Sequence, residues 1–152
     1  MKIMIILKLI ITVIFLTTPI ASSLSSDFLG VIQYLNKYKK EIDNRDLYHS
    51  SAVFQRCSGV FGAYGKYLPS ADKDMKMKFV TLSVKALETA TLLLNKANIN
   101  KQSENIRQVD TAVRYFVDQY YKQLEIEQLN TGSIMQGITA KEMQLCIKLI
   151  KG

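Results

Sequence analysis

The sequence is poor in residues that break helices or turn strands. Of its 152 residues only two are proline, Pro19 and Pro69, and none is tryptophan. It contains no Asn-Gly or Asp-Gly pair, which are the turns that join short hairpins. It also shows no sustained alternation of apolar and polar residues. Long helices are therefore the expected structure.

The motifs of several enzyme classes are also missing. The chain has a single histidine, His49, and no Gly-Lys-Ser/Thr phosphate loop, Gly-x-Ser-x-Gly elbow or His-Glu-x-x-His zinc motif. Asp46 and His49 could offer a metal two ligands on one helix face, which is too few for a site. Among the scattered acids, Glu142 alone borders a predicted apolar stripe. We therefore expect no catalytic residues, no cofactor and no metal site.

The first 23 residues have the layout of a secretory signal peptide. A short charged start precedes an apolar run over residues 3–16, and small residues follow up to Ser23. The run is interrupted by Lys8 and is shorter than the about 20 apolar residues that a membrane span needs. We expect cleavage after Ser23, with Ala21 as the alternative. Residues 24–152 would then form a single domain with no stable membrane span.

The charge pattern limits the classes of partner that the chain is expected to bind. The whole chain has a net charge of +7, and loss of Lys2 and Lys8 with the signal peptide leaves +5. Basic and acidic residues are interleaved, as in residues 72–78, which is typical of a solvated surface rather than a nucleic-acid track. A mild attraction to an anionic membrane surface stays open. The composition and the lack of an Asn-x-Ser/Thr sequon favour the periplasm of a Gram-negative bacterium, with secretion as the alternative.

Apolar spacing predicts five helices, several of which have a serine or threonine near the start that could cap them. Ser26, Ser70 and Ser103 start three of them, and Thr139 with Glu142 has the spacing of a capping box. The segment from Gly132 to Ile138 could be helix or loop. The predicted helices cover residues 26–42, 47–68, 70–98, 103–129 and a stretch from residue 139.

The helix over residues 70–98 has apolar residues on most of its faces. Such a helix is usually buried on all sides. We therefore expect it to be the central helix of an all-α bundle with four or five helices.

The two cysteines, Cys57 and Cys146, both lie in the middle of apolar helix stripes. In an exported protein an even number of cysteines favours a disulfide, which would tie the second helix to the last. The alternative is a reactive thiol. There is no Cys-x-x-Cys motif, however, and His49 lies about 12 Å along the helix from Cys57, so we favour the disulfide.

Two groups of residues are candidates for a partner surface. Gly59, Gly62 and Gly65 recur every third residue in one helix, where each costs about 1 kcal/mol relative to alanine. Close helix packing explains this spacing best, and a strip left open for a partner is the alternative. Tyr115 and Tyr121 fall outside the inner stripe of their helix, as interface tyrosines do. The predicted partner surface consists of Tyr115, Tyr121, Ser58, Gly62 and Gly65.

These features favour a small exported protein that binds another exported or envelope protein and is not an enzyme. Its general format looks like that of small periplasmic inhibitor or immunity proteins, an analogy of architecture only. The second hypothesis is a carrier of an apolar ligand or lipid between helices, because methionines pack adaptably. An enzyme without a recognisable motif is a minor third. The methionines in question are Met75, Met77, Met135 and Met143.

Overall fold

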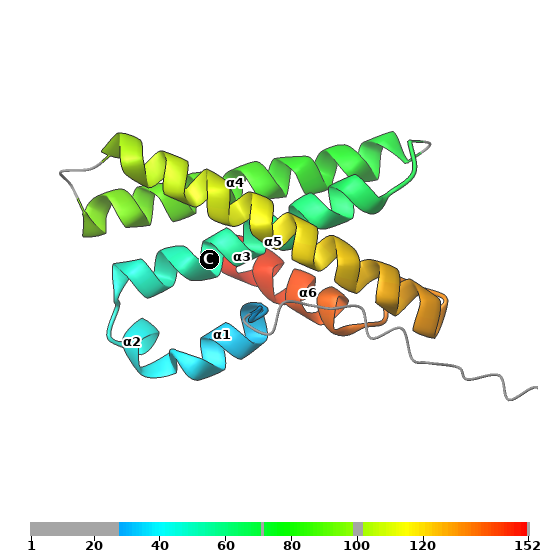
Figure 1. Cartoon of the computed structure of the whole chain (residues 1–152), viewed down its shortest axis with the longest axis horizontal. Helices are drawn as coiled ribbons and strands as arrows, with labels where there is room; N and C mark the ends of the chain where they lie inside the picture. The colour runs from blue at the N-terminus through cyan, green and yellow to red at the C-terminus, as the bar shows by residue number, and fades with distance from the viewer. Residues whose placement is uncertain (1–27, 71, 99–101, 152) are drawn as a thin grey trace, which may run out of the picture.

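The computed structural model describes residues 28–70, 72–98 and 102–151, and these residues form helices and no strand. The predicted all-α fold is confirmed, with six helices in place of four or five (Figure 1). The predicted signal peptide lies outside the described residues. None of the described helices has the length and apolar character needed to cross a membrane. The helices are α1 (Val31–Lys37), α2 (Lys39–Asp43), α3 (Leu47–Tyr67), α4 (Lys73–Ala97), α5 (Gln102–Thr131) and α6 (Ile138–Lys151).

The first predicted helix is in fact two short helices. The chain leaves helical geometry at Tyr38, where φ is −114°, and α2 continues in a new direction. The break brings the Tyr38 ring 4.5 Å from that of Tyr34 and 4.6 Å from His49. The predicted cap, Ser26, lies outside the described residues. Instead α1 follows Gly30, which has no side chain that could cap it.

The central helix is α3, so the prediction that residues 70–98 form the central helix is wrong. Helix α3 contacts each of the other five, whereas α4 leaves Met77, Val84 and Leu92 exposed. Small residues such as Ser51, Ser58 and Gly59 are buried along α3. Because these side chains are small, neighbouring helices can approach the α3 backbone closely from several sides.

The predicted disulfide is present. Cys57 in the middle of α3 is bonded to Cys146 in α6, and the two Cα atoms are 5.4 Å apart. Both side chains are fully buried in the main core cluster. The bond therefore fixes α6 against the centre of α3 across 89 residues of sequence.

Two of the three glycines in α3 mark its contact with α5. A Cβ added at Gly59 would lie 2.4 Å from the Cβ of Phe116, and one at Gly62 would lie 2.6 Å from Val117 Cγ2. At Gly65 the nearest atom, Val80 Cγ2, would be 3.5 Å away, which is an ordinary contact. Close packing thus accounts for Gly59 and Gly62.

The caps predicted for the last two long helices and α6 need correction. Asp72, not Ser70, directly precedes α4, and Ser103 lies inside α5, which begins at Gln102. Gly132, with φ +72°, follows α5, and the chain up to α6 is not helical. Thr139 lies inside α6 rather than before it, and its N–H and hydroxyl donate to Glu127 Oε1, each at 3.0 Å. The predicted capping box with Glu142 is therefore wrong, because both side chains bond to other helices.

Substitution of Gly59 and Gly65 by alanine tests this packing. In Gly59→Ala the new methyl group meets Phe116 at its Cβ, which cannot move without the α5 backbone, so the free energy of unfolding should fall by about 1 to 3 kcal/mol. In Gly65→Ala there is room, and alanine is the better helix former, so a gain of about 0.5 to 1 kcal/mol is expected. Urea unfolding of both oxidised variants checks this. Equal effects at the two sites would contradict the close approach of α5 at Gly59.

Candidate functional site

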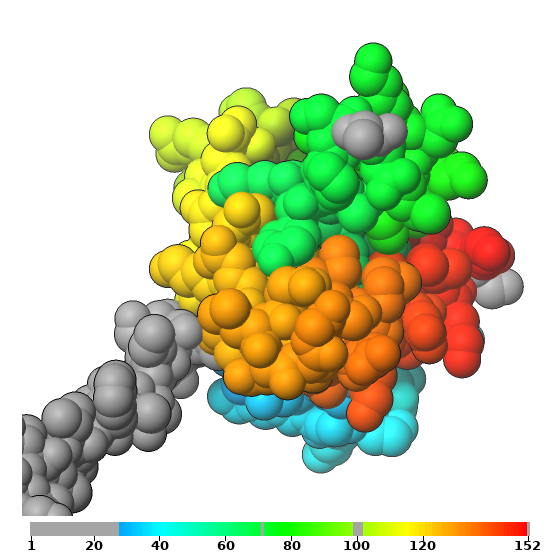
Figure 2. Space-filling model, turned by 90° about the vertical axis from the view of Figure 1, so that its right-hand side faces the viewer, coloured from blue at the N-terminus to red at the C-terminus, as the bar shows by residue number. Residues whose placement is uncertain are grey.

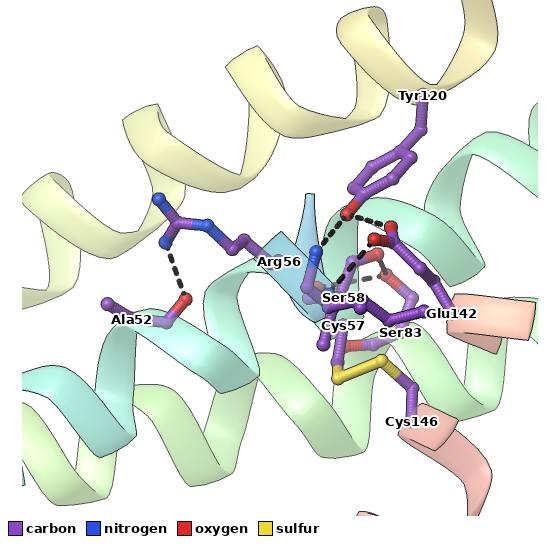
Figure 3. Close-up of a disulfide and its surroundings, with 10 residues drawn as sticks. Ala52, Arg56, Cys57, Ser58, Ser83, Tyr120, Glu142 and Cys146 are labelled. Atoms are coloured by element: carbon purple, nitrogen blue, oxygen red, sulfur yellow. Dashed lines mark hydrogen bonds between the residues drawn. A yellow bond between two sulfur atoms is a disulfide. The ribbon is translucent and has the colours of Figure 1, made fainter. Parts of the chain in front are cut away.

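A buried polar network joins α5, α6 and the start of α1 (Figure 3). The Tyr120 hydroxyl donates to Glu142 Oε2 at 2.7 Å and accepts from the Val31 N–H at 2.9 Å. Glu142 Oε1 accepts from the Ile32 N–H at 3.0 Å. The first turn of α1 is thus capped by side chains from two distant helices, where a carboxylate also suits the helix dipole.

The network is tightly closed. A Cβ at Gly30 would lie only 2.4 Å from Glu142 Oε1, so only glycine allows the chain to pass the carboxylate this closely. Burial raises the pKa of Glu142, although its hydrogen bonds to Tyr120 and Ile32 oppose the shift. Burial raises the pKa of Tyr120 as well. The adjoining hollow is about 140 Å³, small for a substrate pocket, so we assign these residues a positioning role.

Arg56 lies on the other side of the α1 entry. Its Nε donates to the Leu29 carbonyl and its Nη1 to the Ala52 carbonyl, both at 2.9 Å. Its guanidinium carbon lies 3.7 Å from the Tyr34 ring centroid and 4.5 Å from that of Phe116. Burial lowers the pKa of Arg56. No carboxylate in the described part of the chain forms an ion pair with it, so two aromatic faces hold this cation.

Arg56 is the middle of a continuous row of aromatic contacts. On one side the Tyr34 ring leads to Tyr38, and both lie beside the His49 ring. On the other side the Phe116 ring lies 5.4 Å from the ring of Tyr115. The two ends reach solvent, with 54% of Tyr48 and 39% of Tyr115 exposed. We call this set the aromatic row, which consists of Tyr48, His49, Tyr38, Tyr34, Arg56, Phe116 and Tyr115.

The predicted partner surface does not form one surface. Tyr115 is exposed as expected, but Tyr121 is half-buried, with its ring 5.5 Å from that of Tyr67. Ser58 is fully buried and donates to the Ser83 carbonyl of α4 at 2.9 Å. Gly65 is buried and Gly62 lies under Val117. The prediction is therefore wrong for Ser58 and Gly65, which are interior, and Gly62 is half-buried in the contact between α3 and α5.

Asp46 and His49 form a helix cap. The Asp46 carboxylate accepts from the His49 N–H at 2.8 Å, and this hydrogen bond lowers the pKa of Asp46. The described residues contain no group of three or more metal-ligating side chains. One enzyme-like spacing does occur, Ser-x-x-Lys at Ser70 and Lys73, but both side chains are exposed, Ser70 in the turn before α4 and Lys73 at the first residue of α4.

Three of the methionines invoked for a ligand carrier lie at the surface. Met75, Met77 and Met135 are exposed, and only Met143 is in the core. A hollow of about 560 Å³ runs along the outside of α4 and includes Met77 and Leu82. It lies on the outside of the bundle rather than between helices.

The aromatic row was missed at the sequence level, although part of its signal was present. Tyr34 and Tyr38 are four residues apart, and Arg56 follows His49 by seven, so each pair shares one helix face. The break at Tyr38 and the cation between two rings depend on contacts between α1, α3 and α5. Contacts between distant helices leave no pattern in the local sequence from which they could be predicted.

No protein-family model, curated protein or solved structure matches this chain.

The network predicts a pH dependence of stability. The carboxyl of Glu142 has its ordinary pKa near 4.5 when unfolded and a raised pKa when folded. Between these two values the folded state binds more protons, so the free energy of unfolding should fall as pH rises above about 4.5. Glu142→Gln should remove this fall, whereas Glu125→Gln, at an exposed site on α5, should keep it. Urea unfolding between about pH 4.5 and 7.5 measures the slope, and the same slope in both variants would contradict the assignment.

Proposed function

We propose that this chain is an exported, non-enzymatic protein that binds another exported or envelope protein through the aromatic row. The observation that carries the proposal is the exposure of Tyr48 and Tyr115 at the two ends of the row. Tyrosine and arginine are enriched among the residues that dominate protein interfaces. The row supplies an exposed tyrosine at each end and a partly buried arginine between them.

Rigidity behind the exposed rings supports binding. Arg56 is fixed by two backbone carbonyls, and Tyr34 is buried beneath it. Burial raises the pKa of Tyr34 to about 12, so its hydroxyl stays neutral at physiological pH. Side chains that are ordered before association lose less entropy on binding, which favours a recognition role for this surface.

Export is supported by two independent features. The N-terminal sequence has the layout of a signal peptide, and the chain contains a buried disulfide. Structural disulfides persist in oxidising compartments and are rare in the cytosol. The partner is accordingly a protein of the periplasm or the exterior.

Site-directed photocrosslinking tests the proposal. A benzophenone amino acid replaces Tyr48 or Tyr115 in cells that produce the full chain, and a matched control replaces Leu129, which is 83% exposed at the far end of α5. The two tyrosine positions should capture the same protein and Leu129 should not. With that protein purified, Tyr48→Ala and Tyr115→Ala should each weaken binding by about fivefold or more.

Two results would contradict the proposal. One is the absence of a common crosslinked protein at the two tyrosine positions. The other is capture of the same protein at Leu129 with equal yield, because that protein would then contact the surface without regard to the aromatic row.

A further inference from the structure

Helix α6 exposes cations and no acid. Lys141, Lys148 and Lys151 are exposed along it. Its only acidic residue, Glu142, is buried and directed at α1. The exposed charges on α6 are therefore all basic.

The neighbouring edge of α4 adds two more lysines. Leu82 packs against the same core cluster as Ile147 and Ile150 of α6, and α4 and α6 are in contact. Lys78 lies four residues before Leu82 and Lys85 three residues after it, which places both on the same side of the helix. Figure 2 shows α4 in green directly beside the red end of α6.

These lysines are not neutralised by the protein. Lys39, Lys66 and Arg114, which lie elsewhere on the molecule, each have a carboxylate partner. Within residues 28–70, 72–98 and 102–151, none of the lysines on this surface forms an ion pair. Two exposed acids border the surface, Asp74 one turn before Lys78 and Glu88 one turn after Lys85. We call the surface that these lysines form the basic face, which consists of Lys78, Lys85, Lys141, Lys148 and Lys151.

Aliphatic side chains are exposed at the edges of the basic face. Leu149 is 36% exposed and, because it follows Glu142 by seven residues, it lies on the side of α6 toward α1. Leu92 is 55% exposed on α4, two turns after Lys85, and the exposed Glu88 lies between them. Lysines beside exposed aliphatic groups suit a membrane interface, where the amines meet anionic headgroups and the short apolar groups reach the acyl boundary.

We propose that the basic face binds the surface of a bilayer that contains anionic phospholipid. This surface is distinct from the aromatic row, so the inference goes beyond the proposed function. Attraction of unpaired lysines to anionic headgroups supplies the affinity, and it weakens with salt. Leu92 and Leu149 distinguish a bilayer from a soluble polyanion, because only a bilayer offers them an apolar environment.

Vesicle sedimentation tests the proposal. The disulfide-bonded protein, purified as its host exports it, is mixed with vesicles of phosphatidylglycerol and phosphatidylcholine or of phosphatidylcholine alone. A variant with Lys78→Gln, Lys85→Gln, Lys148→Gln and Lys151→Gln is compared with a control that has the same loss of charge elsewhere. The control carries Lys66→Gln, Arg107→Gln, Arg114→Gln and Lys122→Gln.

The unaltered protein should bind the anionic vesicles in preference to the neutral ones. Each lysine near an anionic surface contributes about fivefold, so the basic-face variant should bind at least about tenfold more weakly. The control should stay within about threefold of the unaltered protein. Leu92→Gln with Leu149→Gln should weaken binding to vesicles but not to polyglutamate.

Several results would overturn the proposal. Equal losses in the two charge variants would show that net charge alone matters. No preference for anionic vesicles would remove the interaction itself. Vesicle binding that survives the leucine substitutions, together with equally strong binding of polyglutamate, would indicate an acidic protein instead of a bilayer. Near-ultraviolet circular dichroism and a thiol titration establish that each variant is folded and oxidised.

Discussion

The Cys57–Cys146 bond joins the centre of the central helix to the middle of the last one, and much of the remaining structure depends on it. It closes a loop of 89 residues, for which the chain-entropy model gives about 4 to 5 kcal/mol of stabilisation. By fixing α6, it places Glu142 where the carboxylate caps α1. The segment before α1 then lies beside Arg56, because the Leu29 carbonyl accepts from Arg56 Nε. The guanidinium of Arg56 in turn lies over the ring of Tyr34. The aromatic row is therefore linked through a few contacts to one covalent bond.

The same bond positions the second surface. Because Cys146 is held in the core, the opposite side of α6 faces outward with its lysines, and the edge of α4 lies next to it. The two proposed surfaces thus share one scaffold and use different chemistry. One presents the rings of Tyr48 and Tyr115 at the ends of a row that Arg56 holds in its middle, and the other presents unpaired amines bordered by aliphatic groups.

Much of the fold was predictable from the sequence. The long helices α3, α4 and α5 follow from apolar periodicity and few helix breakers, and Pro69 marks the end of α3 within about one residue. The disulfide followed from two cysteines in apolar stripes. These features are local or nearly so, and local patterns carry the information needed to predict them.

The errors arise where distant parts of the chain meet. Nothing local shows that Tyr120 and Glu142 would cap α1, or that the chain would break at Tyr38 to stack rings on His49. Apolar richness in α4 suggested a central helix, but the small side chains of α3 decided which helix others could approach most closely. The exposure of Tyr115 was predicted correctly. Ser58 and Gly65 became interior because α4 covers them.

The most direct test of the account is the intact mass of the exported protein, measured after alkylation without reduction. The account predicts the mass of residues 24–152 with no alkylated thiol, because both cysteines are joined in one bond. Two alkylated thiols would contradict it, since α6 would then lack its tie to α3 and the argument for export would lose its structural support.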